Sequence, residues 1–527
     1  MKKTKVFSLI ALFMLFFTIG CHNSKMGHVM PAQEYDVSSY DNVMMEEAME
    51  PEPIPHNTEE YDIIRENEFQ DAQQKPLSTF SIDVDNASYS NLRRYLDYEL
   101  PPVDAVRIEE MINYFSYDYP QPTGKHPFSL TTEVSQAPWN PEHQLVHIGL
   151  QGKDLDYDDV KTSNLVFLID CSGSMSDKNK LPLLKSAFNI LLNQLGPDDR
   201  VAIVAYAGAA GLVLPATPAN EKEKILKAFK KLEAGGSTAG GEGIELAYKI
   251  AKENLIEDGN NRVILATDGD FNVGISSTSE MVRMIEEKRK ENIYLTICGL
   301  GMGNYKDGRM EQISNAGNGN YFYIDNIREA EKVFGREMRA NMFTIAKDVK
   351  IQVEFNPAQV KAYRLIGYEN RKLENEDFDD DTKDAGELGA GHTVTALYEI
   401  IPAGSKEEIR KSSNLKYQQS QLTDQAREGK DLLSLKLRYK PIDSEESLLI
   451  ETTVPNEAKK LATTSNDFRF SAAVAGFGLL LRKSKFKGNN TYETVTSLAQ
   501  EALGTDPDGD RAEFIRLVKQ ASLLDTE

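Results

Sequence analysis

The chain has 527 residues, 40% of them apolar, which is enough to bury more than one core and excludes a disordered, collagen-like or disulfide-stapled small protein. Its 60 lysines and arginines against 82 aspartates and glutamates give a net charge of −22. This balance argues against nucleic acid as the main partner, because phosphate binding needs clustered basic side chains. Apart from Cys21 the chain holds Cys171 and Cys298, which we expect to be free, buried thiols.

The first twenty residues are typical of an export signal. Three lysines in the first five positions precede the apolar run 6–20, which is too short to span a bilayer comfortably. Thr18, Ile19 and Gly20 then precede Cys21 in an order that resembles a bacterial lipobox, in which the Cys thiol is lipidated and the chain is cut before it. An ordinary signal peptide is the alternative. We therefore predict a lipid anchor on Cys21, and the absence of Asp directly after it favours the outer over the inner membrane.

Residues 21–75 are acidic and poor in aliphatic side chains, so they cannot offset their ordering entropy by burial and are expected to form a flexible tether. Residues 76–125 are expected to form a small α+β unit with a strand at 79–84 and a helix after it. The Asp83, Asp85, Asn86 cluster between them is interpreted as a helix cap rather than a metal site.

Between residues 163 and 340 the pattern changes to alternating strands and helices. Short continuous apolar runs, typical of strands buried on both faces of a parallel sheet, occur at 165–169, 201–206, 263–266 and 293–298. Segments with helical periodicity alternate with them at 181–195, 221–232, 243–254, 279–290 and 328–339. This alternation predicts a doubly wound α/β domain.

Segments of a different kind lie on both sides of this block. They alternate apolar and polar residues, as half-exposed antiparallel strands do, at 129–134, 145–150, 349–355, 393–400, 432–439 and 448–454. Because they both precede and follow the α/β block, we predict that the block is inserted into a β-sandwich. Residues near 145–150 should then pair with strands from after 345. The predicted domains are 1–20 signal, 21–75 tether, 76–125 α+β unit, 126–160 and 345–460 β-sandwich, 163–340 α/β domain and 461–527 C-terminal helices.

Three sequence pieces converge on one edge of the predicted parallel sheet. Asp170, Ser172 and Ser174 follow the first strand in a D-x-S-x-S spacing, Thr238 lies in a Gly-rich loop, and Asp268 follows the 263–266 strand. Ligands of open α/β sheets bind at the carboxyl ends of strands. Hydroxyl and carboxylate oxygens suit a small divalent cation, so these five residues form the candidate metal site.

This arrangement resembles the von Willebrand factor type A domain and its metal-ion-dependent adhesion site. The resemblance implies that Ser172 and Ser174 bind Mg²⁺ (or Mn²⁺) directly, Thr238 directly or through water, and Asp170 and Asp268 mostly through water. It leaves the sixth position for a partner protein's Asp or Glu carboxylate. The implied fold class is α/β: a doubly wound, mostly parallel, Rossmann-like domain inserted in an antiparallel β-sandwich, with a small N-terminal α+β unit and C-terminal helices.

The flanks also resemble those of a family of bacterial envelope proteins that carry a von Willebrand factor A domain between their own N- and C-terminal domains. The segments that carry this likeness are 81–96, 364–370, 386–399, 467–482 and 511–514. It implies a protein of the bacterial cell envelope. Together with the predicted lipid anchor and the adhesion-site resemblance, this leads us to expect a membrane-anchored protein that binds a protein ligand through the metal site. Nucleic acid is not expected as a partner because of the charge, nor nucleotide because Gly299, Gly301 and Gly303 match neither a dinucleotide-binding motif nor a P-loop.

Two alternatives remain open. An exported hydrolase, metal-dependent or with Ser172 or Ser174 as nucleophile, would need a base, but every histidine lies outside residues 148–391: His22, His28, His56, His126, His143, His147 and His392. A structural subunit of an envelope complex would dock without using its metal. We expect a binding protein rather than an enzyme, with no catalytic residue.

Overall fold

The structure, a computed structural model, describes most of the chain after its N-terminal region: residues 59–82, 85–155, 161–207, 209–235, 241–269, 278–303, 305–409 and 421–526. Two compact units divide the chain, Met1–Ile54 and Pro55–Glu527, and the described residues belong to the second. Cys21, the predicted lipid anchor, lies outside them. No helix among the described residues has the length and apolarity needed to cross a bilayer.

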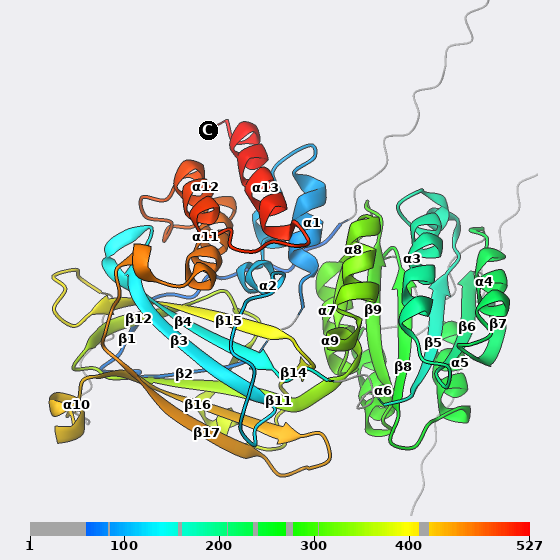
Figure 1. The fold of residues 1–527 in the computed structure, drawn as a ribbon, viewed down its shortest axis with the longest axis horizontal. Coiled ribbons are helices and arrows are strands. Elements are labelled where there is room, and N and C mark those ends of the chain that lie inside the picture. The colour runs from blue at the N-terminus through cyan, green and yellow to red at the C-terminus, as the bar shows by residue number, and fades with distance from the viewer. Residues whose placement is uncertain are drawn as a thin grey trace, which may run out of the picture. The chain divides into compact units, whose positions relative to one another are not determined.

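The apolar runs of the central block form one six-stranded sheet in the order β10-β9-β8-β5-β6-β7, parallel except for β7 (Figure 1). Its strands are β5 (Ser163–Asp170), β6 (Arg200–Ala207), β7 (Ala209–Pro218), β8 (Asn260–Thr267), β9 (Tyr294–Leu300) and β10 (Tyr321–Ile324). Every residue of β5 and β8 is buried, which explains the continuous apolar runs at their centres. The four predicted strands are confirmed; the edge strands β7 and β10 were not predicted.

Helices cover both faces of this sheet, as a doubly wound domain requires. Alternate residues of β5 point to opposite sides: one face packs with α3 and α4, the other with α5, α6 and α7. The helices are α3 (Leu181–Gln194), α4 (Lys222–Lys230), α5 (Gly241–Glu253), α6 (Thr278–Lys290), α7 (Asp307–Ala316), α8 (Ile327–Glu331) and α9 (Met338–Met342). The single helix predicted at 328–339 is instead α8 and α9, separated by a π-helical turn, Lys332–Arg336.

The flanking segments form two packed antiparallel sheets. One has the order β1-β12-β15-β4-β3 and the other β13-β2-β11-β16-β17, with β14 beside β11. The first contains β1 (Gln70–Asp71), β3 (Phe128–Ala137), β4 (Asn140–Gly152), β12 (Val360–Ile366) and β15 (Thr393–Pro402). The second contains β2 (Leu77–Ser81), β11 (Thr344–Phe355), β13 (Lys372–Leu373), β14 (Gly386–Gly389), β16 (Asp431–Pro441) and β17 (Leu448–Pro455).

The predicted pairing across the insertion is confirmed. Strand β4, which precedes the α/β block, pairs with β15, which follows it, so that Val146 lies opposite Tyr398 and Ile148 opposite Ala396. These side chains join one buried core between the two sheets. The α/β domain is therefore an insertion in the sequence of the sandwich, between strands β4 and β11.

The predicted N-terminal α+β unit is not separate. Its strand β2 belongs to a sandwich sheet, and its helices pack in one hydrophobic core with the C-terminal helices (Figure 1). This helical layer contains α1 (Ala87–Tyr95), α2 (Ile108–Asn113), α11 (Asn466–Leu481), α12 (Tyr492–Glu501) and α13 (Asp510–Leu524); the short α10 (Asp424–Glu428) lies apart on the sandwich. The unit's aromatic residues explain the difference, since Phe115 packs edge-on against Phe470 and Phe514.

The predicted tether extends too far toward the C-terminus. Residues from Glu59 onward pack on the body: Glu59 pairs with Arg94 at 2.7 Å, and β1 pairs with β12. Polar contacts hold this segment together with a few apolar side chains, Tyr61, Phe69 and Ala72, which are too few to show a periodic pattern in the sequence. The predicted helix cap falls on Asn86, which is the N-cap residue of α1 but makes no side-chain capping bond. The Asp85 carboxylate accepts from the amide of Tyr321 at 2.9 Å and pairs with Arg371 at 3.0 Å.

Two buried arginines join the α/β domain to the helical layer. Arg93 on α1 pairs with Asp325 at 2.5 Å and Glu329 at 2.7 Å in the α/β domain, and with Glu513 on α13 at 2.7 Å. Arg107 pairs with three carboxylates, those of Glu110, Asp307 and Glu311. Each guanidinium thus compensates several buried carboxylates at the junction.

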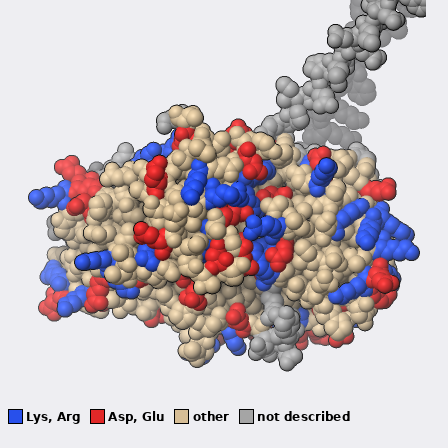
Figure 2. Space-filling model, turned by 45° about the horizontal axis from the view of Figure 1, so that its top comes forward, with Lys and Arg blue, Asp and Glu red and all other residues tan. Residues whose placement is uncertain are grey.

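Charged side chains on the outer surface are mixed in sign. On the face in Figure 2, lysines and arginines of the described residues lie among aspartates and glutamates over much of the surface. Such a distribution differs from the continuous basic stripe by which nucleic-acid-binding proteins attract phosphates.

Candidate functional site

The candidate site lies at the carboxyl ends of two neighbouring strands at the centre of the sheet. Asp170 is the last residue of β5, and Asp268 comes directly after β8, its parallel neighbour. After Asp170 the chain turns into a short 3₁₀ helix, Gly173–Ser176, that leads to α3. The sequence thus brings both predicted carboxylates to one edge.

The Asp170 carboxylate is enclosed and bonded to its own loop. One of its oxygens accepts from the Ser172 amide at 2.8 Å; the other accepts from the hydroxyls of Tyr206 and Thr267, each at 3.2 Å. Asp170 is fully buried. Burial raises the pKa of this carboxyl group, although these hydrogen bonds partly oppose the change. Both oxygens are thereby fixed at the base of the loop.

Asp268 is equally buried but only partly bonded. Its Oδ2 accepts from the Lys180 ammonium at 3.0 Å, whereas its buried Oδ1 has no partner among the described residues. Lys180 is itself buried, and its stem lies over Gly301, where a Cβ would come within 2.1 Å of the Lys180 Cε. The oxygen without a partner makes this edge a candidate binding site, since a buried carboxylate oxygen without a partner is costly.

The two predicted serines supply hydroxyl oxygens next to these carboxylates. The Oγ atoms of Ser172 and Ser174 lie 3.0 Å apart. Ser172 is buried and Ser174 is exposed, so this pair connects the buried carboxylates with the surface. Each hydroxyl retains lone pairs that can bind a cation.

Thr238 lies outside the described residues. Gly235 is the last described residue before Thr238. Its amide donates to the Cys171 carbonyl at 2.8 Å, next to the D-x-S-x-S loop. Cys171 and Cys298 are both buried and free, as predicted.

The donor set fits a small divalent cation. Hydroxyl and carboxylate oxygens are the ligands that Mg²⁺ prefers, and an orphaned carboxylate oxygen lies at the same edge as the serine pair. The described residues contain no group of three or more His, Cys, Asp or Glu side chains able to hold a metal. A cation here would therefore depend on hydroxyls to supplement two carboxylates.

Sequence reasoning missed three residues of the site. Lys180, Tyr206 and Thr267 all contact the predicted carboxylates, but none belongs to the spaced motif. Thr267 could have been suggested by its position beside Asp268. Lys180 precedes the apolar face of α3 and has no distinguishing pattern, because its contact with Asp268 joins residues 88 positions apart.

The described histidines lie in other surroundings. His126 bonds to Tyr439, His143 to Glu399 and Glu407, and His147 to Tyr119, all within the sandwich and the segments beside it. His392 lines a different cavity, together with Arg336 and Glu337. None of the contacts found for these four described histidines is with Ser172 or Ser174.

Three protein families match successive parts of the chain: "von Willebrand factor" over residues 55–147, "von Willebrand factor type A domain" over 164–336, and "Uncharacterized protein YfbK, C-terminal" over 340–524. The fold and the site therefore define a protein built around a von Willebrand factor type A domain. Domains of this class commonly mediate protein interactions and commonly bind a divalent metal at the adhesion site.

The chain belongs to the YfbK family. The Escherichia coli (strain K12) protein described as "Uncharacterized protein YfbK" is 43% identical over 472 residues, which cover 88% of this chain and 81% of that protein. A Synechocystis protein, "Uncharacterized protein sll0103", is 30% identical over 190 residues, 36% of this chain and 44% of that protein. Among solved structures, "von Willebrand factor type A from Catenulispora acidiphila" has a TM-score of 0.42 at 16% identity and covers 77% of this chain and 91% of its own.

Proposed function

We propose that this protein is a lipid-anchored component of the bacterial envelope that binds a protein partner through a metal-dependent adhesion site. The observation that carries the proposal is the buried Asp268 oxygen without a partner, next to the Ser172 and Ser174 hydroxyls. The proposal also includes localisation at the outer membrane, through lipid on Cys21, and the absence of catalytic activity.

The residues have distinct roles in this proposal. Ser172 and Ser174 would bind Mg²⁺ (or Mn²⁺) directly through their hydroxyls, Thr238 directly or through water, and Asp170 and Asp268 mostly through water. When bound, the metal supplies an electrophilic centre that attracts an oxygen anion. Tyr206 and Thr267 orient Asp170 by hydrogen bonds, so that the carboxylate cannot swing out of the site.

The donor set favours an acidic partner group. Neutral hydroxyls provide little negative charge, and carboxylates held one water away compensate a divalent cation only in part. A Glu or Asp side chain of the partner would complete both the coordination and the charge, which Lys, Arg or an apolar side chain could not do. The proposed ligand is therefore a protein surface that presents an exposed carboxylate.

Calorimetric titration with Mg²⁺ and Mn²⁺ tests the metal site. Wild type is expected to bind one ion, and Asp268→Ala to lose measurable binding. Ser176→Ala is the matched control, because Ser176 lies on the same loop, is exposed and is not in the donor set. Equal binding by wild type and Asp268→Ala would refute the site.

Crosslinking and pull-down from native envelopes, with and without chelator, tests the partner. The Ser172→Ala, Ser174→Ala double variant should lose the metal-dependent partner and keep its circular dichroism spectrum, because the loop lies above a core built from β5, β6 and β8. Undiminished capture by the double variant would mean that partners dock elsewhere, as expected of a structural subunit.

A further inference from the structure

A second candidate site lies at the opposite end of the α/β domain, where the chain enters and leaves it. A cavity of about 760 Å³ is lined by Leu155 and Lys161, just before the domain, and by Phe343 and Ile345, just after it. The start of β8 forms its floor. Clefts between domains are preferred places for small ligands.

The floor of this cavity carries a buried arginine with incomplete bonding. Arg262, in β8, is 1% exposed; its Nη1 donates to Thr296 at 2.7 Å and its Nη2 to the Met342 carbonyl at 3.4 Å. Its buried Nε has no partner among the described residues, and the centroid of the Tyr294 ring lies 5.7 Å from the guanidinium carbon. Burial lowers the pKa of Arg262 to about 10, so the group still carries its charge at neutral pH.

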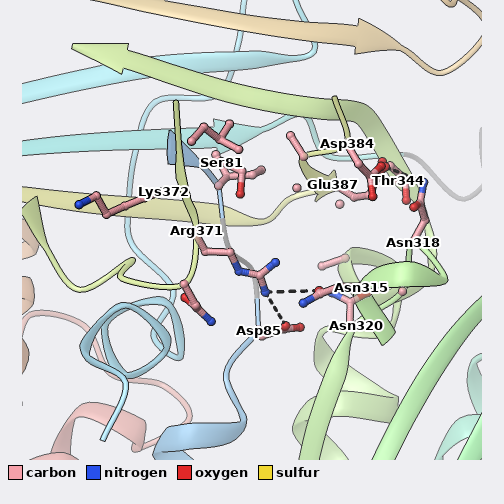
Figure 3. Close-up of a pocket in the computed structure, with 18 residues that line it drawn as sticks. Ser81, Asp85, Asn315, Asn318, Asn320, Thr344, Arg371, Lys372, Asp384 and Glu387 are labelled. Carbon is pink, nitrogen blue, oxygen red and sulfur yellow. Dashed lines mark hydrogen bonds and ion pairs between the residues drawn. The ribbon is translucent and has the colours of Figure 1, made fainter. Parts of the chain in front are cut away.

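Glu387 is a nearby acid whose charge favours the charged form of Arg262, but among the described residues the two side chains form no ion pair. Figure 3 shows Glu387 beside Asp384 and Thr344, where it lines a smaller cavity of about 210 Å³. Its Oε1 accepts from Asn318 at 2.8 Å. Burial and neighbouring carboxylates raise the pKa of Glu387 well above its usual value, which favours the neutral acid. The charge of Arg262 is thus left without a fixed counter-ion among the described residues.

The remaining walls combine an apolar surface with a charged rim. Ile256, Met342, Phe343 and Ile345 contribute apolar side chains next to Arg262. The charged side chains of the lining are Lys153, Lys161, Lys347, Glu257, Asp258 and Asp443. Lys161 and Asp443 are 4.0 Å apart and both well exposed, so this pair hardly neutralises the rim.

We propose that this cavity binds a small amphipathic anion, whose carboxylate or phosphate group pairs with Arg262 and whose apolar body lies along the apolar wall. The unpartnered Nε–H lies on the same edge of the guanidinium as Nη2, and such an edge suits two parallel hydrogen bonds to an oxyanion. Arg262 and Asp268 are six residues apart on one strand, or about 20 Å. The anion site is therefore separate from the metal site and does not rest on it.

Calorimetry on the full-length protein tests the proposal with four probes: hexanoate, hexyl phosphate, hexanol and inorganic phosphate. Hexanoate or hexyl phosphate should bind with one-to-one stoichiometry, and Arg262→Met should weaken that binding at least tenfold. Arg427→Met, at an exposed position on α10, is the matched control and should bind as wild type does. The two alkyl anions distinguish a carboxylate from a phosphate ligand.

Met is chosen because it can replace a buried guanidinium stem without leaving an unpaired charge, so the variant should keep its circular dichroism spectrum. Arg262→Lys, which retains the charge but not the fork, should bind more weakly than wild type and more tightly than Arg262→Met.

Several outcomes would overturn the proposal. They are equal affinity of wild type and Arg262→Met, binding of hexanol as tight as that of hexanoate, and inorganic phosphate binding as tightly as hexyl phosphate. A fourth concerns the acidic residues between Leu155 and Lys161, which lie outside the described residues. If the probes bind only after Asp156, Asp158 and Asp159 are changed to Asn, a carboxylate of the chain itself is the partner of Arg262, and the proposal of an external ligand is wrong.

Discussion

The α/β domain treats its buried carboxylates in two ways. At the junction with the helical layer, Asp325 and Glu329 both pair with Arg93, so their charges are compensated by a neighbouring element. At the carboxyl edge of the sheet, Asp170 has only hydroxyl and amide partners, and Asp268 has one lysine and one oxygen without a partner. Among the described residues the first arrangement is complete and the second is not.

This difference teaches how to separate structural from functional acids in the same domain. Arginine presents several donors in a rigid plane, so Arg93 can satisfy Asp325, Glu329 and Glu513 together. Lys180 is a single flexible point charge and satisfies one oxygen of Asp268. An acid held by hydroxyls and a lysine remains available to a cation, whereas an acid held by arginine does not.

The largest expected effect comes from breaking the compensated group. Arg93→Ala leaves three buried carboxylates without their common cation, and we expect the free energy of unfolding to fall by about 3–5 kcal/mol. Urea denaturation followed by circular dichroism measures the loss.

Arg427→Ala provides the matched control, because its guanidinium is exposed and lies 3.7 Å from the exposed Asp424. An exposed pair of this kind should contribute less than about 1 kcal/mol. Similar losses in the two variants would show that the Arg93 group is no different from a surface ion pair, and the comparison would fail.

The sequence predicted most of the fold because its main strands carry patterns set by burial. β5 and β8 are buried throughout, and the runs 165–169 and 263–266 at their centres are continuously apolar. β4 and β15 pair across the insertion as predicted, but they are not half-exposed: residues 145–152 and 394–401 are buried, because the helical layer covers the outer face of their sheet. It predicted Asp170, Ser172, Ser174 and Asp268 at one edge because the carboxyl ends of parallel strands meet there.

What the sequence could not predict depends on contacts between distant polar residues. Arg93 and Asp325 are 232 positions apart, and Lys180 and Asp268 are 88 apart, with no periodicity to connect them. Ion pairs hold the segment around Glu59, and backbone hydrogen bonds hold β1. Because such contacts need few apolar residues, the composition of this packed segment is similar to that of a flexible tether. Local patterns report burial of apolar side chains, and these contacts are polar.

His147 is a titratable group that is buried without any ion pair among the described residues. His147 is 1% exposed, its Nε2 lies 2.8 Å from the Tyr119 hydroxyl, and burial lowers its pKa to about 4. Because its pKa in the folded protein is below that of the unfolded chain, its contribution is present above pH 6.5 and is lost as the pH falls through 4. The contribution is about 3 kcal/mol.

His147→Gln tests this, since Gln can still bond to Tyr119 but does not titrate. The loss of unfolding free energy between pH 7 and pH 4 should be smaller in this variant than in wild type by about 3 kcal/mol. His126→Gln is a control, because His126 is bonded to Tyr439 at the edge of the sandwich and its pKa is only moderately lowered by burial and Lys125. Parallel pH curves for wild type and His147→Gln would contradict the assignment.

The smallest expected effect sharpens the comparison at the metal site itself. Lys180 neutralises the Asp268 carboxylate at 3.0 Å, so a cation that uses Asp268 has to compete with the ammonium for it. Lys180→Met removes the competitor and keeps an apolar stem against Gly301. We expect Mg²⁺ to bind about tenfold more tightly to this variant, or about 1.4 kcal/mol. Without metal the variant should be less stable than wild type, because Asp268 is then buried with no partner.

Lys178→Met, an exposed change on the same loop, should leave both quantities unchanged. Calorimetry gives the affinity and urea denaturation gives the stability. Unchanged Mg²⁺ affinity together with reduced stability would place Asp268 among the structural acids, paired with Lys180 as Asp325 is paired with Arg93.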